Sequence, residues 1–395
     1  MSKASTTKVL LTGGGTGGHI TPLLAVAHKL KKLDPSIYTV YVGERGSKFG
    51  SMTKDQSVFD AQKKIFAGKF RRYHGESWGK RLFDIKTNLQ NIRDLFYVTL
   101  GMFESVVLLI REKPDVILLK GGFVGMPVGL AAALLRIPFI THDSDALPGL
   151  ANRVVARWAR WHATGMPASF YKYKEGTVKY VGVLVGEAYK FVTEERCHDY
   201  RRELGIPLDA TVLMVTGGSN GSQKLNQAMA QHIVALKAKY PKLHVLHQTG
   251  NGKEDVYSEI YPDGVDWIVA QDLFKQMYRY SGAADVVITR AGANTLAEFG
   301  VQGKACVVVP NPLLTGGHQL INAAELEKHQ AVVVIKETEL AERFEPVLTE
   351  LLEDDKLRRT YGKKLRGLSK VDAAETLAKL LQDTIAPIKN TDDEV

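Results

Sequence analysis

The hydrophobic positions of this chain fall into short continuous runs that alternate with longer amphipathic stretches. Runs of about four or five mostly apolar residues predict strands at 8–11, 38–42, 115–119, 139–142, 211–215, 244–248, 265–269, 286–289, 306–309 and 331–335. Strands that are apolar on both faces are typical of a parallel sheet covered by helices on each side. The alternation therefore predicts an α/β protein.

The intervals between these runs show the spacing of amphipathic helices. This spacing predicts helices at 22–33, 88–111, 126–135, 222–240, 290–303 and 318–329. In the long helix at 88–111 we expect a set of apolar side chains to face inward, namely Ile92, Leu95, Val98, Val106 and Ile110.

The same order of elements occurs in both halves of the chain. Each half opens with a strand, a glycine-rich turn and a helix, which predicts two Rossmann-like, doubly wound domains. We place the first domain at residues 1–178 and the second at 179–369, with a final helix at about 370–388 that returns to the first domain. Two domains also agree with a length of 395 residues.

The composition is that of an ordinary globular protein, with 45% hydrophobic and 24% charged residues. Two cysteines, Cys197 and Cys306, are too few for a disulfide framework or a four-cysteine zinc site. The chain opens without a secretory signal pattern, and its apolar runs are too short or too interrupted to cross a bilayer. These features favour the reducing cytosol.

The formal net charge is +9 and the isoelectric point is about 9.2. No nucleic-acid-binding motif accompanies this charge, so we expect no nucleic acid partner. Most of the excess lies at 61–93, which holds nine basic and two acidic residues. This segment is either a solvated basic face or a surface for an anionic membrane.

Residues 12–19 form a glycine-rich turn between a predicted strand and helix. Glycines let the backbone approach a ligand closely, and the start of a helix attracts an anion. Gly13, Gly15 and Gly18 have the spacing of a dinucleotide-binding loop, and Glu44 after the next strand could bind a ribose. On spacing alone, a nicotinamide-dependent enzyme and a tight turn without a ligand both stay open.

Similar turns in the second half, at 216–222, 292–295 and 314–319, also open helices. In open α/β sheets, ligands bind at the carboxyl edge, where these helix starts would converge. Two such edges facing each other predict a cleft with a sugar nucleotide on one wall and an acceptor on the other. This pattern weakens the oxidoreductase interpretation.

Five blocks follow one another along the chain: GGGTGGHITPLLAVAHKL, KPDVILLKGGFVGMPVGLAA, GGSNGSQKLNQAM, TRAGANTLAE and GGHQLINAAELEK. Together they resemble the MurG family of peptidoglycan N-acetylglucosaminyltransferases, from about residue 9 to residue 335. The resemblance implies a two-domain GT-B fold and no metal or other cofactor. It also implies inverting transfer of N-acetylglucosamine (GlcNAc) from UDP-GlcNAc to a polyprenyl-pyrophosphate-linked acceptor, lipid I, which gives lipid II in peptidoglycan synthesis.

On the acceptor side, the resemblance implies roles for the first two glycine loops. Residues of these loops match positions that face the acceptor, namely Thr16, Gly17, Gly18, His19 and Phe123. His19 is the candidate base for the attacking hydroxyl, because a histidine of near-neutral pKa suits proton removal. A histidine that only hydrogen-bonds phosphate is the alternative.

On the donor side, the resemblance implies that a second set of residues holds UDP-GlcNAc, namely Ser219, Asn220, Gly221, Phe274, Thr295, Glu298, His318 and Gln319. Glu298 matches the acid that holds the ribose, since a carboxylate accepts two hydrogen bonds from a diol. A helix-capping acid is its alternative. Phe274 falls near the position whose backbone recognises uracil, and Gln319 matches a glutamine that reads the sugar hydroxyls.

The family works on the cytoplasmic face of the cell membrane, through a basic and hydrophobic patch in its N-terminal domain. The segment 61–93 falls at that place, so the resemblance favours an anionic membrane surface as a partner and a peripheral location. The residues expected to form the patch are Lys69, Arg71, Arg72, Trp78, Lys80, Arg81 and Phe83.

The chain departs from the family pattern on the acceptor side. The family's His-Glu-Gln-Asn reads His142-Asp143-Ser144-Asp145, so that Asp145 replaces an amide near the acceptor. The same residues spell D-x-D, which elsewhere binds a divalent metal, although we expect none here. The family's Gly-Asn-Pro-Val-Arg reads Gly-Val-Leu-Val-Gly at 182–186. A related transferase with another glycolipid acceptor and a non-catalytic protein of this fold therefore stay open as alternatives.

Overall fold

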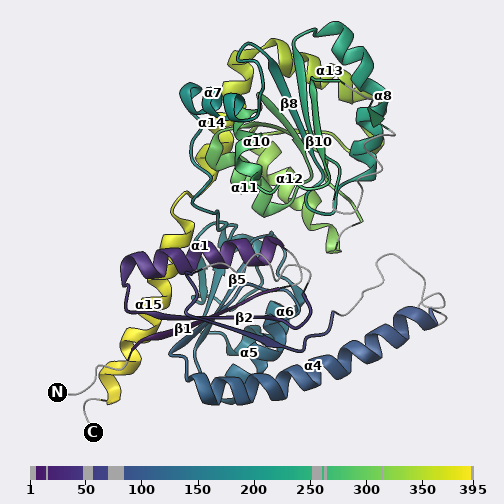
Figure 1. Cartoon of the computed structure of the whole chain (residues 1–395). Coiled ribbons are helices and arrows are strands. Elements are labelled where there is room, and N and C mark those ends of the chain that lie inside the picture. Colours follow the sequence, from purple (N-terminus) through teal and green to yellow (C-terminus); the bar gives the residue numbers. More distant parts are fainter. Residues whose placement is uncertain are drawn as a thin grey trace. The chain divides into compact units, whose positions relative to one another are not determined.

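The chain forms two compact α/β units (Figure 1). The structure, a computed structural model, describes residues 6–14, 17–47, 57–69, 84–250, 260–261, 265–313 and 315–392. The first unit comprises Met1–Gly186 and Val371–Val395, and the second comprises Glu187–Lys370.

A seven-stranded parallel sheet forms the centre of the first unit. Its strands are β1 (Lys8–Thr12), β2 (Tyr38–Glu44), β3 (Ala61–Ile65), β4 (Val116–Leu119), β5 (Phe139–Asp143), β6 (Trp161–Thr164) and β7 (Val178–Tyr180). Their order is β3-β2-β1-β4-β5-β6-β7, so the direction in which strands are added reverses between β1 and β4. The carboxyl end of such a switch point is where open α/β sheets bind ligands.

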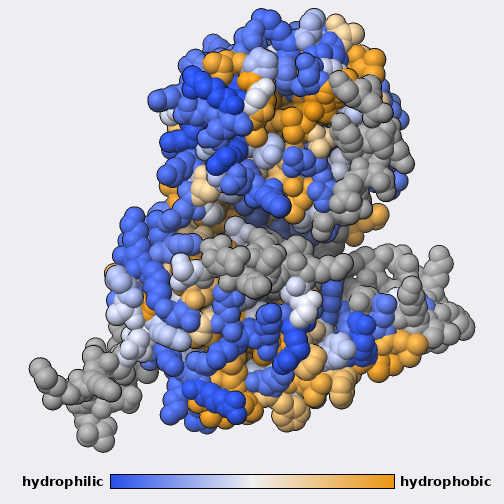
Figure 2. All heavy atoms as spheres, viewed as in Figure 1, coloured by the Kyte–Doolittle hydropathy of each residue, from blue (hydrophilic) through white to orange (hydrophobic). Residues whose placement is uncertain are grey.

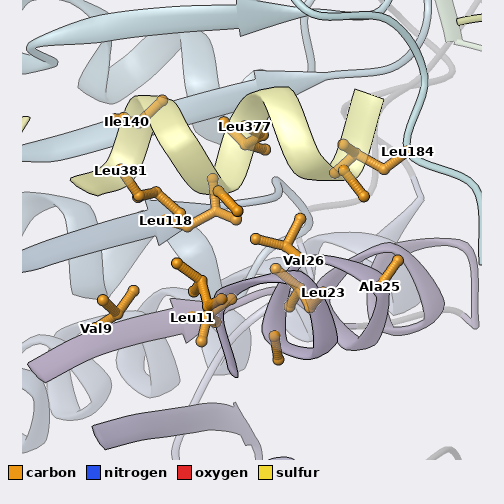
Figure 3. Packing of buried hydrophobic residues seen from close by; sticks show 14 of the residues in the cluster. Val9, Leu11, Leu23, Ala25, Val26, Leu118, Ile140, Leu184, Leu377 and Leu381 are labelled. Carbon is orange, nitrogen blue, oxygen red and sulfur yellow. The ribbon is translucent and has the colours of Figure 1, made fainter. Parts of the chain in front are cut away.

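Helices cover both faces of this sheet: α1 (Gly17–Leu33), α4 (Ile85–Glu112), α5 (Gly125–Leu134), α6 (Leu150–Val155) and α15 (Ala373–Asp392). Helices α1 and α15 share one face, where Figure 3 shows Leu377 and Leu381 of α15 close to Leu118 of β4 and Val26 of α1. Helices α4, α5 and α6 cover the other face. The last helix of the chain thus completes the core of the first unit.

The second unit has a six-stranded parallel sheet of order β10-β9-β8-β11-β12-β13. Its strands are β8 (Thr211–Thr216), β9 (Leu243–Gln248), β10 (Ile268–Gln271), β11 (Val286–Thr289), β12 (Ala305–Val308) and β13 (Val333–Val334). Strands β8, β11 and β12 are almost entirely buried, as their continuous apolar runs predict. The predicted fold class, two Rossmann-like domains of the GT-B type, is confirmed.

The helices of the second unit are α7 (Glu194–Glu203), α8 (Gln223–Lys239), α10 (Met277–Ala283), α11 (Ala293–Gln302), α12 (His318–Lys328), α13 (Leu340–Glu353) and α14 (Asp355–Leu368). Helices α8 and α13 pack on one face of the sheet. Helices α10, α11, α12 and α14 contribute to the core on the other face. Four of these helices, α7, α10, α13 and α14, are absent from the sequence-based prediction.

Helix α4 corrects one expectation in detail. Val98 is buried and Val106 packs on the core, but Ile92, Leu95 and Ile110 are 65%, 56% and 54% exposed. The stripe that faces the protein consists largely of small or polar residues, including Gly101 and Ser105. A Cβ on Gly101 would overlap the carbonyl oxygen of Phe66, so at this position the helix lies too close to the segment after β3 for a side chain. Most of the larger apolar side chains point outward, although Leu109 is buried in the core.

Leu377 offers a test of the role of α15. Its side chain is fully buried between α1 and the sheet. We expect Leu377→Ala to lower the free energy of unfolding of the first unit by about 2–5 kcal/mol, because the removed atoms leave a cavity. Urea unfolding followed by fluorescence measures the change. Val371→Ala, at a side chain that is 66% exposed, is the control, and an equal loss in both variants would contradict the packing of α15.

Candidate active site

Two glycine loops meet at the carboxyl edge of the first sheet, after β1 and after β4. Gly122 has a φ of 73°, and a Cβ on it would overlap the carbonyl oxygen of Gly14. Only glycine permits both this backbone conformation and this approach. The contact fixes the β4 loop directly against the turn that leads into α1.

His19 lies in the first turn of α1, where it is half-buried. Loss of hydration and the positive charge of Lys120 together lower the pKa of its imidazole to about 4, and Asp145 partly opposes both effects. His19 is therefore unprotonated at neutral pH. Gly18 beside it is exposed, whereas Thr16 lies outside the described residues.

Lys120 is a site residue that the sequence analysis missed. It ends the apolar run of β4 and is only 4% exposed, and its Nζ donates a hydrogen bond to Ser144 Oγ at 2.9 Å. Burial lowers the pKa of the ammonium to about 8, against the raising effect of Asp143 and Asp145. A charged residue directly after a fully buried strand was the available signal.

Asp143 does not behave as an open metal ligand. Its Oδ1 accepts hydrogen bonds from the Gly149 amide and Asn152 Nδ2, and its Oδ2 accepts one from the Tyr173 hydroxyl at 2.7 Å. The carboxylate thus holds the β5 loop together. Asp145, the other acid of the D-x-D spacing, is half-buried. Across the described ranges, no group of three or more His, Cys, Asp or Glu side chains is placed to hold a metal ion.

Phe123, expected on the acceptor side, follows the glycines of the β4 loop. Its half-buried ring packs against the core formed by α5 and the sheet. Of the seven residues expected to form the membrane patch, the structure describes Lys69, which is exposed. The other six, Arg71, Arg72, Trp78, Lys80, Arg81 and Phe83, lie outside the described residues.

In the second unit, the loop after β8 carries three of the expected donor residues. Ser219 is half-buried, Asn220 is exposed, and Gly221 has a φ of 67°. A Cβ on Gly221 would overlap the carbonyl oxygen of Thr249, so this loop touches the loop after β9. Ser222 then caps α8, with its Oγ accepting a hydrogen bond from the Leu225 amide. The arrangement presents hydroxyl and amide groups beside a helix start.

Gln248 holds these loops in place and was also missed from the sequence. Its Nε2 donates to Thr216 Oγ1 at 3.1 Å and to the Gly218 carbonyl at 3.0 Å, and its Oε1 accepts from the Phe274 amide at 2.9 Å. The residue is 1% exposed. One buried amide thereby connects the β8 loop to the segment between β10 and α10.

Phe274 is positioned by its ring as well as by its amide. The ring is 3% exposed and stacks on Tyr280, with 3.8 Å between ring centroids. The residues before and after Phe274, Leu273 and Lys275, line a cavity of about 670 Å³ together with Thr249, Asp272 and Tyr280. A cavity of this size suits a small ligand.

Glu298 lies on α11, one helical turn after Thr295, and both side chains are half-buried. Burial raises the pKa of the Glu298 carboxyl to about 7, and a hydrogen bond from the Tyr189 hydroxyl limits this rise. Glu298 is not in the first turn of α11, which contains no acidic residue. The helix-capping interpretation is therefore wrong.

His318 and Gln319 open α12. Gln319 is 6% exposed, and its Oε1 accepts a hydrogen bond from the Asn311 amide at 2.9 Å. Asn322, one turn later, donates from Nδ2 to the Ala291 carbonyl. This block thus links the start of α12 to the loop after β11, next to Thr295 and Glu298 in sequence. Within the second unit, the structure joins the β8, β9 and β10 loops through Gln248 and Gly221, and it joins the β11 loop to α12.

Comparison with protein families defines the class of this protein. The N-terminal domain model of glycosyltransferase family 28 matches residues 9–164, and its C-terminal domain model matches residues 212–377. The fold agrees with the crystal structure of Acinetobacter baumannii MurG, at a TM-score of 0.68 and 24% identity over 95% of this chain and 99% of that one. It also agrees with the calicheamicin glycosyltransferase CalG4, at a TM-score of 0.66 and 15% identity over 97% and 99% of the two chains. The chain belongs to glycosyltransferase family 28.

Within this family, the chain is similar to UDP-N-acetylglucosamine–N-acetylmuramyl-(pentapeptide) pyrophosphoryl-undecaprenol N-acetylglucosamine transferases. The one from Thermoanaerobacter sp. (strain X514) is 31% identical over 382 residues, which are 95% of this chain and 99% of the relative. The one from Clostridium perfringens (strain SM101 / Type A) is 33% identical over 356 residues, or 90% and 92% of the two chains. Membership of this family replaces the nicotinamide interpretation of the first glycine loop.

Gln248→Leu tests whether this amide holds the donor-side loops. The variant keeps the volume of the side chain but removes all three hydrogen bonds. We expect about tenfold faster hydrogen exchange at the Phe274 amide and a loss of about 1–3 kcal/mol in stability, because buried polar groups are left unpaired. Hydrogen–deuterium exchange with mass spectrometry measures the first effect. Gln227→Leu, at an exposed position of α8, is the control; unchanged exchange at Phe274 would contradict the assignment.

Proposed function

We propose that this chain transfers GlcNAc from UDP-GlcNAc to lipid I and forms lipid II, as a MurG-type glycosyltransferase. The observation that carries this conclusion is the match over 95% of the chain to transferases of that one name. The loops at the carboxyl edges of both sheets support it, because they carry hydroxyl, amide and carboxylate groups of the kinds that such substrates need. The two substrates are a sugar nucleotide and a lipid-linked acceptor.

The donor belongs to the second unit in this proposal. The Glu298 carboxylate accepts hydrogen bonds from the ribose hydroxyls, and Thr295 lies beside it on the same face of α11. Ser219, Asn220 and Gly221 bind the diphosphate. As the glycosidic bond breaks, negative charge grows on the leaving UDP, and fixed hydroxyl and amide donors in this loop stabilise it.

The remaining donor contacts involve the base and the sugar. The backbone of Phe274, with the cavity beside it, receives the uracil. Gln319 and His318, at the start of α12, read the hydroxyls of the GlcNAc ring. The hydrogen bond from the Asn311 amide to Gln319 Oε1 supports this role, because it leaves the Nε2 group as the one that meets the sugar.

The acceptor belongs to the first unit. Its hydroxyl oxygen attacks the anomeric carbon, the bond from that carbon to UDP breaks, and the configuration inverts. His19 accepts the proton of the attacking hydroxyl, for which an unprotonated imidazole is required. Gly17, Gly18 and Thr16 hold the acceptor diphosphate near the start of α1, while Phe123 and Asp145 border the acceptor sugar.

A membrane contact follows from the outer face of α4, and Figure 2 shows hydrophobic surface along this helix. Its exposed apolar side chains are Leu89, Ile92, Leu95, Phe96, Phe103, Val107 and Ile110. No helix among the described residues is long and apolar enough to cross a bilayer. From the exposed apolar face and the exposed Lys69, we propose that α4 lies on an anionic membrane surface and that the protein is peripheral to the cytoplasmic face of the cell membrane.

Glu298→Gln tests the ribose assignment. Because only the ionised carboxylate accepts both hydrogen bonds, we expect the affinity of the wild-type chain for UDP-GlcNAc to fall about tenfold from pH 8 to pH 6, through the Glu298 pKa of about 7. The variant should bind about tenfold or more weakly at pH 8 and lose this pH dependence. Calorimetry measures both. Glu342→Gln, at an exposed acid, is the control; a variant that keeps the pH dependence would exclude Glu298 as its source.

Charged substitutions on α4 test the membrane contact. We expect the double variant Ile92→Glu, Phe103→Glu to bind phosphatidylglycerol vesicles at least tenfold more weakly, because two apolar side chains that would enter the membrane are lost and two negative charges repel anionic lipid. Vesicle sedimentation measures binding. Val234→Glu, at a side chain of the second unit that is 69% exposed, is the control. Equal vesicle binding by all three proteins would show that α4 does not contact the membrane.

A further inference from the structure

We propose that Lys120 binds the diphosphate of the lipid-linked acceptor and so determines how tightly the first unit holds that substrate. This inference rests on the proposed function. It adds a residue to the acceptor side for which neither the sequence analysis nor the family resemblance supplies a role. Three observations support it: the position of Lys120, the hydrogen bond of its ammonium to Ser144, and the charges around it.

The position of Lys120 is fixed from two sides. Its backbone amide donates to the Thr12 carbonyl, which places the residue at the end of β4 beside the end of β1. The position that a Cβ would take on Gly13 is 3.2 Å from Lys120 Cβ and 3.2 Å from the His19 carbonyl oxygen. Lys120 therefore lies next to the turn that opens α1, at the switch point of the sheet, where α/β sheets bind ligands.

A hydrogen bond holds the Lys120 ammonium in place, but it uses only one of the three N–H donors. An ammonium carries three N–H donors. Within the described part of the chain, Lys120 Nζ has one hydrogen bond, to Ser144 Oγ at 2.9 Å. The two remaining N–H donors of this buried cation favour a ligand that can accept two or more hydrogen bonds. The oxygens of a phosphate group can do so.

The neighbouring acids explain why the ammonium stays charged although it is 4% exposed. Asp143 and Asp145 both favour the protonated form of Lys120. Asp143 uses both carboxylate oxygens on Gly149, Asn152 and Tyr173, so it does not form a direct ion pair that would occupy the ammonium. His142 and His19, the other titratable side chains that interact with Lys120, have lowered pKa values and carry no charge at neutral pH.

The start of α1 adds to this attraction. A helix of 17 residues has a partial positive charge at its first turn, which favours an anion nearby. The buried lysine and the first turn of the helix both lie close to Gly13. Two negative charges of a diphosphate suit this pair better than a neutral sugar does.

A competing interpretation is that Lys120 acts only through His19, by keeping the imidazole unprotonated. The two roles differ in kinetics. A diphosphate ligand contributes to the binding of the acceptor before reaction, so its loss raises the acceptor KM. A group that acts on His19 changes kcat and moves the acid limb of the pH profile to higher pH.

Lys120→Met separates these roles, because it keeps the length of the side chain and removes the charge. The assay uses the full chain, UDP-GlcNAc and a water-soluble acceptor with a short prenyl chain and a diphosphate-linked N-acetylmuramyl pentapeptide. We expect the acceptor KM to rise about ten- to a hundredfold, with kcat and the donor KM within about twofold of wild type. Lys172→Met, at an exposed lysine of the same unit, is the matched control and should behave as wild type.

Inorganic pyrophosphate provides a second readout. It should inhibit the wild-type chain competitively against the acceptor, and Lys120→Met should reduce this inhibition at least tenfold. Competition against UDP-GlcNAc alone would place the anion in the second unit and overturn the proposal. Should Lys120→Met fail to fold in a thermal melt, Ser144→Ala removes only the anchor of the ammonium and should raise the acceptor KM about threefold; an unchanged KM in that variant overturns the proposal.

The remaining outcomes are also decisive. An unchanged acceptor KM in a folded Lys120→Met variant, or a fall in kcat with a shifted pH profile, overturns the proposal and leaves the proposed function in place. If the wild-type chain binds UDP-GlcNAc but transfers GlcNAc to no diphosphate-linked acceptor, the proposed function fails and this inference fails with it.

Discussion

The structure depends on loops that approach each other too closely for any side chain. At the first sheet, Gly122 lies against the carbonyl oxygen of Gly14, and at the second sheet, Gly221 lies against that of Thr249. Each contact joins loops from adjacent strands at the carboxyl edge of a parallel sheet. The helices that follow these loops therefore start at a fixed position relative to the sheet. The glycines near the helix starts leave room for a ligand to approach the backbone amides. Both sheets thus end in helix starts of the kind that bind phosphate groups in other α/β proteins.

Buried polar side chains complete what the glycines begin. Gln248 connects the β8 loop to Phe274, Asp143 ties together its own loop and Tyr173, and Ser144 fixes the ammonium of Lys120. Each of these groups would cost free energy if it were left unpaired in the interior. Because they are paired on folding, the loops need little further ordering when a ligand arrives. Such prior organisation raises affinity and stabilises charge that develops during reaction.

The parts of this fold that sequence could predict are those governed by local pattern. Most inner strands are continuously apolar because both of their faces are buried, and these were predicted to within a few residues, whereas the short strands β6 and β7 were missed. The edge strand β3 alternates exposed and half-buried positions and contains two lysines, as edge strands do to avoid pairing with other chains, and it was missed. Lys120 and Gln248 were missed for another reason. Their importance comes from contacts with residues 24 to 32 positions away in the chain, which no local pattern reveals.

Helix α4 shows what the spacing of apolar residues does not predict. The spacing of its apolar residues correctly indicates a helix with two unlike faces, but spacing does not say which face meets the protein. Here the middle of the buried face admits only small side chains, because Gly101 lies against Phe66 and Ser105 is fully buried, whereas Leu109 near the end of the helix reaches the core. The larger apolar side chains, such as Phe96 and Phe103, are more than half exposed as a consequence. Large exposed apolar patches mark contact sites, and the extent of this face along a helix of 28 residues is the reason for the membrane contact proposed above.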